Sequence, residues 1–273
     1  MSARSIDVTV RSLDGLGLVG TLVQPEGQSN HAVVLVHGGG VTRHEAGFFT
    51  RLASGLADGG VASLRFDLPG HGESEGRQEE LSLAGVLNAI RAARAHICQE
   101  TGTDVASLVA ASFSGGLAAY YAARRQADVE RLVLFNPLLD YKQRFVDQKD
   151  FWQDDYLTEE AARALAKHSF LPHSPSFKLS RALLNEVFWL DARGALADIK
   201  APTLVVHGTR DTFIPIESSR DADRRLTAPH QLLEVEGAQH GFAVHEDPTY
   251  ANPQSQAWQA EVIAAVRNWL TAS

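Results

Sequence analysis

Cysteine is nearly absent from this chain of 273 residues, because Cys98 is the only one, and an intramolecular disulfide is therefore excluded. Long hydrophobic runs are also absent, since no apolar stretch approaches the ~18 residues that suggest a transmembrane helix. The N-terminus has no basic head followed by an apolar stretch, so we expect no signal peptide. These absences predict a cytoplasmic protein without a membrane partner.

Positive charge is scarce as well. The chain has 25 Lys and Arg against 33 Asp and Glu, a net charge of −8, and no basic block, which argues against nucleic-acid binding. No His, Cys and Glu cluster has the spacing of a metal site, and no dinucleotide or P-loop fingerprint is present. We therefore expect no metal and no cofactor, and the sequence does not specify an oligomeric state.

The composition, 44% hydrophobic and 21% charged residues, is that of a globular protein. Residues 5–25 alternate apolar and polar around Asp14-Gly15, which predicts a β-hairpin. Buried strands and helices then alternate, which is typical of an α/β fold with a mostly parallel sheet and helices on both faces. The predicted strands are Ala32–His37, Ala62–Asp67, Ala106–Ala111, Arg131–Asn136, Thr203–His207 and Gln231–Val235, and the predicted helices are Gly47–Asp58, Leu83–Glu100, Phe113–Arg125 and Gln254–Leu270.

One long segment interrupts this alternation. We interpret residues 140–198 as an inserted helical cap on a core made of 1–139 and 199–273, with helices at Thr158–His168 and Phe177–Trp189 and no strand pattern. Nine of the 21 aromatic residues lie in this segment. They either fill the core of the cap or also line a substrate pocket. The candidate pocket residues are Phe151, Trp152, Phe188 and Trp189.

A serine, an acid and a histidine follow three of the predicted strands. Ser112 comes after Ala106–Ala111, Asp211 follows the strand that begins at Thr203, and His240 follows the last strand. Ligands of open α/β sheets bind beyond the carboxyl ends of the strands, so these side chains are expected at one edge. The order Ser, Asp, His along the chain is that of the α/β-hydrolase arrangement.

Five motifs in sequence order make the resemblance more specific. They are LVHGGG, DLPGHGES, AASFSGG, HGTRD and GAQHGF. Together they resemble the landmarks of the α/β-hydrolase superfamily over essentially the whole chain. The N-terminal hairpin and the mid-chain insertion resemble its feruloyl/cinnamoyl-esterase and dienelactone-hydrolase-like branch. The resemblance implies an α/β-hydrolase fold and a serine nucleophile at the turn between a strand and a helix.

The nucleophile motif departs from the G-x-S-x-G pattern, because Ala110 and Ser114 flank Ser112 where glycines are usual. A second register would make Ser114 the nucleophile and keep one glycine. Strand phase favours Ser112, which lies one residue beyond the strand, whereas Ser114 falls inside the first helical turn. Ser114 is then a helix hydroxyl that bonds locally.

The remaining roles follow from the chemistry of a serine nucleophile. His240 is the candidate base, with His37, His71 and His245 as alternatives. Asp211 would orient the base, with Asp140 as an alternative acid. The oxyanion would bind the backbone N–H of Phe113 and of Gly39, or of Gly40.

The sequence thus predicts a serine esterase or thioesterase that cleaves a small-molecule ester with an apolar or aromatic acyl group through an acyl-enzyme. The alternatives are an acyltransferase, a lactone-forming enzyme or a C–C bond hydrolase with the same triad, and a non-catalytic binding module on the same scaffold.

Overall fold

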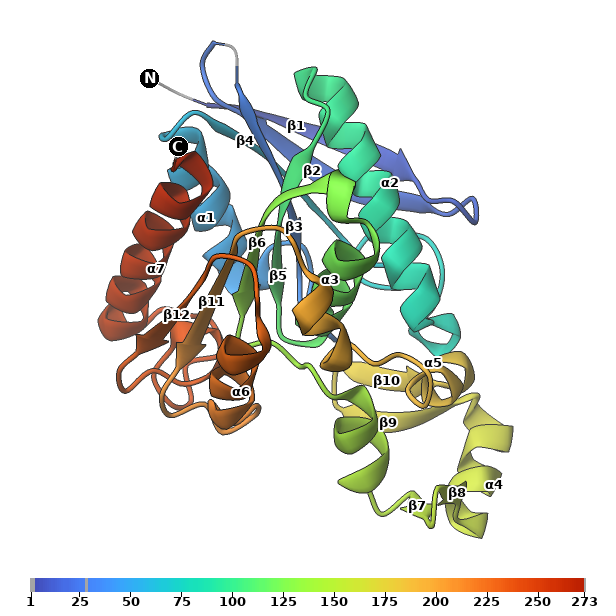
Figure 1. Cartoon of the computed structure of the whole chain (residues 1–273). Coiled ribbons are helices and arrows are strands. Elements are labelled where there is room, and N and C mark those ends of the chain that lie inside the picture. The colour runs from blue at the N-terminus through green and yellow to red at the C-terminus, as the bar shows by residue number, and fades with distance from the viewer. Residues whose placement is uncertain (1–2, 28, 273) are drawn as a thin grey trace.

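The protein is described by a computed structural model of residues 3–27 and 29–272, built around an eight-stranded sheet (Figure 1). Strands β1, β2 and β4 are joined antiparallel, and all other neighbours in this sheet run parallel. The predicted mostly parallel sheet is confirmed. In spatial order the strands are β1 (Arg4–Arg11), β2 (Gly17–Gln24), β4 (Val61–Phe66), β3 (His31–Val36), β5 (Ala106–Ala111), β6 (Val129–Phe135), β11 (Thr203–Gly208) and β12 (His230–Val235).

Alternate residues of the central strands face two different apolar layers. In β3, Val34 and Val36 pack into the layer on one face, and Val33 and Leu35 pack into the layer on the other. Helices cover both faces (Figure 1), so the central strands are buried on both sides and form continuous apolar runs in the sequence. The covering helices are α2 (Leu83–Thr101) and α3 (Phe113–Arg124) on the first face, and α1 (Phe48–Ala57) and α7 (Pro253–Thr271) on the second.

The N-terminal hairpin forms one edge of the sheet. β1 and β2 pair in register from Arg4 opposite Gln24 to Arg11 opposite Gly17. The turn between them uses Gly15 at a φ of 92°, a backbone conformation that glycine adopts without steric cost. The predicted hairpin around Asp14-Gly15 is therefore confirmed.

The segment between β6 and β11 contains strands as well as helices, which corrects the sequence prediction. Its helix at 158–168 was predicted correctly, with Thr158 as the N-cap of α4. The stretch predicted as one helix from Phe177 to Trp189 instead begins as a strand, and the helix starts only after Ser180. Polar and turn residues at 172–176 hide this hairpin from a periodicity argument. The elements are η4 (Gln143–Asp147), β7 (Trp152–Gln153), β8 (Tyr156–Leu157), α4 (Glu159–His168), β9 (Phe170–Ser174), β10 (Phe177–Ser180), α5 (Arg181–Glu186) and η5 (Gly194–Asp198).

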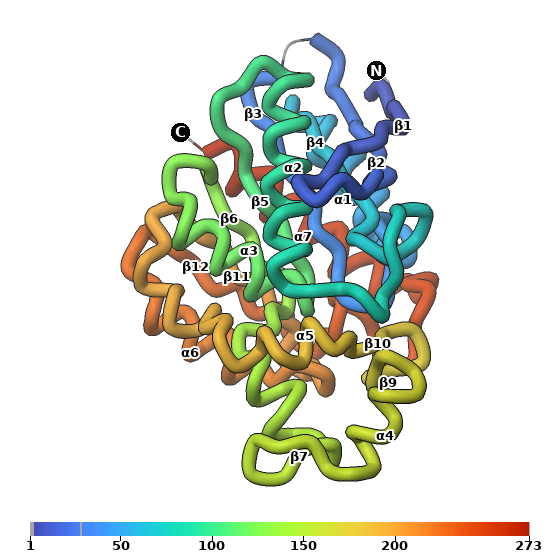
Figure 2. The backbone as a smooth tube through the Cα atoms, turned by 90° about the vertical axis from the view of Figure 1, so that its right-hand side faces the viewer, coloured from blue at the N-terminus to red at the C-terminus, as the bar shows by residue number. Residues whose placement is uncertain are grey.

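Most of this segment, from η4 to α5, lies beyond the carboxyl ends of the parallel strands, whereas η5 returns alongside α3 (Figures 1 and 2). Its buried residues Tyr141, Phe145 and Phe177 belong to the same apolar layer as Phe113 and Leu117 of α3. The segment is thus packed onto the sheet layer without a break in the apolar interior. The division into a core of 1–139 and 199–273 and a cap of 140–198 stays a prediction.

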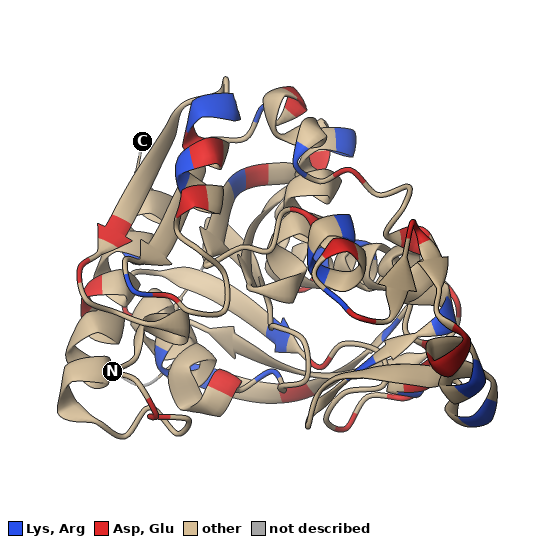
Figure 3. Ribbon diagram, turned by 90° about the horizontal axis from the view of Figure 1, so that it is seen from below, with Lys and Arg blue, Asp and Glu red and all other residues tan. Residues whose placement is uncertain are grey.

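Charged residues of both signs are interspersed over the periphery, while the strands at the centre carry few (Figure 3). One polar helix, α6 (Glu217–Arg225), lies beside β11 and β12 and was not predicted, because it buries only Ser219 and Ala222. Within 3–27 and 29–272, no helix combines the length and the apolar character required to cross a membrane.

Candidate active site

Ser112 occupies the sharp turn between β5 and α3. Its backbone has a φ of 51° and a ψ of −118°, a conformation that a non-glycine residue adopts only when its surroundings enforce it. Two hydrogen bonds hold the turn: the Ser112 N–H donates to the Phe135 carbonyl at 2.8 Å, and the Ser112 carbonyl accepts from the Leu138 N–H at 2.9 Å. The strained turn presents Ser112 to a cavity that it lines.

The residues that flank Ser112 explain how the motif forms without its usual glycines. Ala110 and Ser114 are both fully buried, and the Ser114 hydroxyl donates to the His37 carbonyl at 2.6 Å. Close packing falls one residue later, since a Cβ on Gly115 would lie 2.6 Å from the Cβ of Pro137. Ser114 therefore faces the protein interior, as expected of a helix hydroxyl that bonds locally.

His240 and Asp211 form a hydrogen-bonded pair beside the same cavity. The His240 Nδ1–H donates to Asp211 Oδ2 at 2.7 Å, and the Asn136 side-chain amide donates to the same oxygen at 2.8 Å. His207 Nε2 lies 3.3 Å from it. Two backbone N–H groups of the following turn, at 2.8 and 3.0 Å, bind the other oxygen.

These contacts fix the ionisation state of Asp211. Burial by itself raises its pKa, but hydrogen bonds from His207 and His240 outweigh burial and hold the pKa well below its usual range. The carboxylate therefore stays ionised. It fixes the proton of His240 on Nδ1, which leaves Nε2 free to accept another proton.

The glycine loop, residues 38–40 after β3, contains three backbone N–H groups, and two of them have partners. The Gly38 N–H donates to the Glu45 carboxylate at 2.5 Å, and the Gly40 N–H donates to His71 Nε2 at 3.2 Å. Across residues 3–27 and 29–272 we find no partner for the Gly39 N–H. Glycine is needed here because a Cβ on Gly39 would lie 2.8 Å from the Phe177 ring. Of the two predicted alternatives, Gly39 is thus better placed than Gly40 to bind an oxyanion.

The second predicted oxyanion donor is the Phe113 N–H. Phe113 is the first residue of α3, and the first N–H groups of a helix have no partner within it. The Phe113 ring contacts Phe177 with centroids 5.0 Å apart, and the Tyr141 hydroxyl donates to the Phe113 carbonyl at 2.5 Å. The start of the helix is therefore fixed beside Ser112.

Glu45 lines the cavity and was missed by the sequence analysis. It is buried, with a φ of 46°. Burial raises the pKa of Glu45, while the Gly38 N–H and the positive charge on His240 oppose that rise. No motif marks this residue, because it reaches the site only through the turn before α1.

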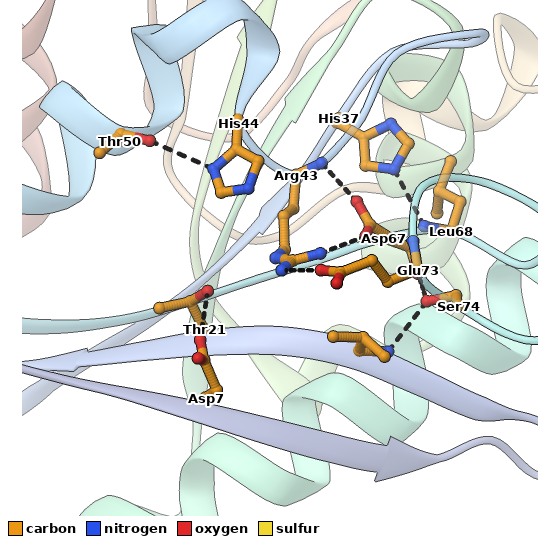
Figure 4. Close-up of polar contacts among 11 residues, drawn as sticks. Asp7, Thr21, His37, Arg43, His44, Thr50, Asp67, Leu68, Glu73 and Ser74 are labelled. Atoms are coloured by element: carbon orange, nitrogen blue, oxygen red, sulfur yellow. Dashed lines mark hydrogen bonds and ion pairs between the residues drawn. The ribbon is translucent and has the colours of Figure 1, made fainter.

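A second polar network connects the glycine loop to the loop of residues 67–74, which carries the DLPGHGES motif (Figure 4). Buried Asp67 accepts from the Arg43 N–H at 2.7 Å and pairs with its guanidinium, which also pairs with Glu73. His37 Nε2 accepts from the Leu68 N–H at 2.9 Å. Because a backbone N–H can only donate, Nε2 carries no proton and His37 is neutral. Burial is the main cause that lowers its pKa to about 3.

The cavity has a volume of about 520 Å³ and combines polar groups at its base with aromatic walls. Its core side includes Gly39, Glu45, Ser112, Asn136 and His240. Residues of the segment 140–198 complete it. They are Arg144, Phe145, Lys149, His173, Ser174, Pro175, Ser176 and Phe177.

The four aromatic residues predicted to bind substrate are not among the residues that line this cavity. Trp152 and Phe188 stack edge to face with centroids 5.4 Å apart, and the Trp152 indole N–H donates to the Phe145 carbonyl at 3.0 Å. Phe151 is half-buried against the apolar layer, and Trp189 is 85% exposed. The aromatic residues that line it are instead Phe48, Phe113, Phe135, Phe145, Phe177, Phe213, Phe242 and Tyr250.

Other candidates lie away from the pair. Asp140 accepts from the Gln143 N–H at 2.9 Å and so stabilises its own turn. His245 is exposed and lies 3.9 Å from Glu246. Within the described ranges, no group of three His, Cys, Asp or Glu side chains is arranged to hold a metal ion.

Comparison with known proteins decides the family. The sequence matches the alpha/beta hydrolase family over residues 33–251, which is most of the chain. This chain belongs to the alpha/beta hydrolase family. The prediction drawn from the five motifs is confirmed for the family and for the fold, and the protein is a hydrolase by family.

Three solved structures are similar in fold over nearly the whole chain. Est1E from Butyrivibrio proteoclasticus, solved with ferulic acid bound, is 18% identical, with a TM-score of 0.76 and 95% of this chain and 99% of that chain covered. Dienelactone hydrolase from Anabaena variabilis is 20% identical, with a TM-score of 0.66 and coverage of 98% and 97%. Monoacylglycerol lipase from Paleococcus ferrophilus is 23% identical, with a TM-score of 0.64 and coverage of 99% and 98%. At these identities the likeness concerns the fold.

Proposed function

We propose that the protein hydrolyses a small-molecule carboxylic ester or thioester through an acyl-enzyme, with Ser112 as nucleophile. The observation that carries this proposal is the strained Ser112 turn, which opens on the same cavity as the hydrogen-bonded His240–Asp211 pair. These three residue types are needed together, because a serine hydroxyl is a weak nucleophile until a base removes its proton.

Each group has one task in the proposed reaction. The Ser112 oxygen attacks the ester carbonyl carbon while its proton passes to His240 Nε2. The N–H groups of Phe113 and Gly39 bind the oxygen that becomes negative. His240 then gives the proton to the leaving alcohol or thiol, and the acyl group remains on Ser112. A water molecule, deprotonated by His240, releases the acid and restores the serine. Asp211 stabilises the imidazolium in both halves of the reaction.

The shape of the cavity supports an apolar or aromatic acyl group. Phe113, Phe145 and Phe177 line the cavity, with Phe113 and Phe177 in edge-to-face contact, and they offer ring faces and edges to a substrate. Est1E, whose structure was solved with ferulic acid bound, supports the same choice by analogy. Acyl transfer, lactone formation and C–C bond hydrolysis remain alternative reactions of the same triad, and a non-catalytic module is the alternative without chemistry.

The test compares two serines that lie two residues apart. Ser112→Ala should lower turnover of a nitrophenyl ester by at least about a thousandfold, because it removes the hydroxyl that attacks the carbonyl carbon. Labelling with a fluorophosphonate and peptide mapping should place the adduct on Ser112.

The matched control is Ser114→Ala. It removes the bond to the His37 carbonyl and should cost about 1 kcal/mol of stability while turnover persists. If the label is found on Ser114, or if turnover is lost only in Ser114→Ala, the wrong serine has been assigned. If wild-type protein takes no label and hydrolyses no ester, the non-catalytic alternative holds.

A further inference from the structure

Two cationic side chains on the cap side of the cavity have no acidic partner. Arg144, in η4, and Lys149, just after it, both line the cavity. In the part of the chain that the structure describes, neither side chain forms an ion pair. Other cations of the same segment do: Lys142 lies 2.8 Å from Asp147 and 2.8 Å from Asp155, and Arg193 lies 2.8 Å from Asp221.

The unpaired charges of Arg144 and Lys149 influence each other and His173 on the same wall of the cavity. Both side chains are half-buried. Burial, then the positive charge of Arg144, lowers the pKa of Lys149, and Asp150 only partly offsets this. His173 stands on the same wall. Its Nδ1 is buried and has no partner among the residues described, and burial with the charges of Lys149 and Arg144 lowers its pKa to about 4.

The remaining charged groups of the cavity lie on its core side. Glu45 is bound to the Gly38 N–H, and Asp211 is bound to His240, so neither carboxylate is available to the cap side. Phe145 and Phe177 belong to the apolar wall. The cavity is therefore lined both by the proposed nucleophile, Ser112, and by uncompensated positive charge from residues of the segment 140–198.

Half-buried cations without partners are costly, and a bound anion removes that cost. A guanidinium also offers paired donors that match a carboxylate. We propose that the substrate carries an anionic group, of which a carboxylate is the simplest, that Arg144 and Lys149 bind while an apolar spacer lies along Phe145 and Phe177. This inference rests on the proposed ester hydrolysis and specifies the substrate class.

The test uses pairs of esters that differ in one charge. In the first pair, mono-4-nitrophenyl adipate carries the carboxylate on the acyl side and 4-nitrophenyl hexanoate is its neutral counterpart. In the second pair, 4-carboxyphenyl hexanoate carries it on the leaving group and its methyl ester is neutral. We expect wild-type kcat/KM to favour the anionic member of one pair by at least about tenfold, which also identifies the side that faces the cap. Higher ionic strength should reduce this preference.

The variant Arg144→Gln/Lys149→Gln should lose the preference, mainly through KM. The matched control Arg163→Gln/Lys167→Gln removes the same two residue types from exposed positions on α4 and should retain it. If the wild-type protein favours the neutral member of both pairs, or if both double variants behave alike, the inference is overturned while ester hydrolysis stands.

A binding measurement separates this inference from the proposed function. Monomethyl adipate and dimethyl adipate are titrated calorimetrically into the protein with Ser112→Ala. At least about tenfold tighter binding of the monoanion, abolished in Arg144→Gln/Lys149→Gln, supports the anion site even if no ester is turned over. Equal binding of the two compounds overturns it.

Discussion

At the scale of single residues, the region around Ser112 shows which positions tolerate substitution and which do not. The usual glycines two residues before and after Ser112 are replaced by Ala110 and Ser114, which are both fully buried. The residues that must be small are Gly115 and Gly116, because a Cβ on Gly115 would lie 2.6 Å from Pro137 and one on Gly116 would lie 2.4 Å from the Leu138 carbonyl oxygen. Close packing therefore falls on the two residues after Ser114, whose hydroxyl connects α3 to the end of β3.

Glu45 supplies a residue-level prediction. Glu45→Gln keeps an oxygen for the Gly38 N–H but removes the negative charge near His240. The imidazolium that forms during the reaction loses that stabilisation, so kcat should fall by about threefold to tenfold with little change in KM. Steady-state kinetics on a neutral ester measures this.

Glu45→Ala is the comparison variant. It leaves a buried N–H without a partner and should lower the free energy of unfolding by about 1–3 kcal/mol. A Glu45→Gln protein with unchanged kcat would show that the carboxylate acts only through its hydrogen bond.

At the scale of elements, the hairpin of β9 and β10 decides the shape of the cavity. It provides His173, Ser176 and Phe177 to the wall. Side chains before α2 hold it: the Gln78 amide donates to the Ser176 carbonyl at 3.2 Å and accepts from the Lys178 N–H at 3.1 Å. The Lys178–Glu79 ion pair at 2.7 Å and the Ser180 hydroxyl, which donates to the Leu81 carbonyl, also attach β10 to this segment.

Gln78→Ala should loosen this hairpin selectively. Loss of two hydrogen bonds at a partly exposed site should lower the free energy of local opening of the hairpin by about 1–2 kcal/mol. Hydrogen exchange of the amides in 174–178 should accelerate several-fold, while exchange in α2 stays constant. Glu80→Ala, at an exposed neighbouring position, is the matched control. Equal exchange rates in both variants would mean that the Lys178–Glu79 ion pair, the Ser180 hydrogen bond and the packing of Phe177 hold the hairpin without Gln78.

The same elements show how far the sequence could predict this molecule. Buried parallel strands form continuous apolar runs, so the order of strands and helices was predictable from β3 to α7. The β9–β10 hairpin was not, since Pro172, His173 and Ser174 interrupt any alternation. Helix α6 was not either, because its charged surface carries almost no apolar stripe and ion pairs such as Arg225–Asp221 stabilise it.

For the site, the order of motifs indicated Ser112, Asp211, His240 and Gly39, and the fold brings all four to one cavity or to its wall. The sequence did not identify Glu45 and Asn136 as site residues, because no spacing rule connects them to the strand ends. The cap aromatics were chosen by composition, which cannot distinguish a ring that lines a cavity from one that packs beside it. Side-chain direction depends on the hairpin that the sequence did not reveal.

At the scale of the whole molecule, buried neutral histidines connect loops that are distant in sequence. Burial is the main cause of a lowered pKa in the buried His37 and His71 and in the half-buried His173, and for His37 and His173 the values are about 3 and about 4. The folded protein therefore excludes protons that the unfolded chain binds at these positions.

The pH dependence of stability follows with a definite sign. Unfolded histidine has a pKa near 6.5, so the contribution of His37 is complete above that pH and declines as the pH falls toward about 3. Between about pH 7 and pH 5 the free energy of unfolding should drop by up to ~1.4 kcal/mol per pH unit for each such histidine. Glu45, with its raised pKa, acts in the opposite direction at the lower end.

Denaturant titrations at three pH values in this range measure the slope. Replacement of the exposed His245 by Gln should leave it unchanged. A flat profile would contradict neutral, buried histidines in the folded state.

The unbroken packing of residues 140–198 onto α3 restricts how a reactant reaches the serine. A flap that swings open needs an interior of its own, whereas here Phe145, Leu171 and Phe177 share theirs with Phe113. Lifting them into water would cost roughly 25 cal/mol for each square ångström of apolar surface exposed. Reactants consequently reach Ser112, the proposed nucleophile, through the existing opening of the cavity. The dimensions of that opening select among reactants before any bond is broken.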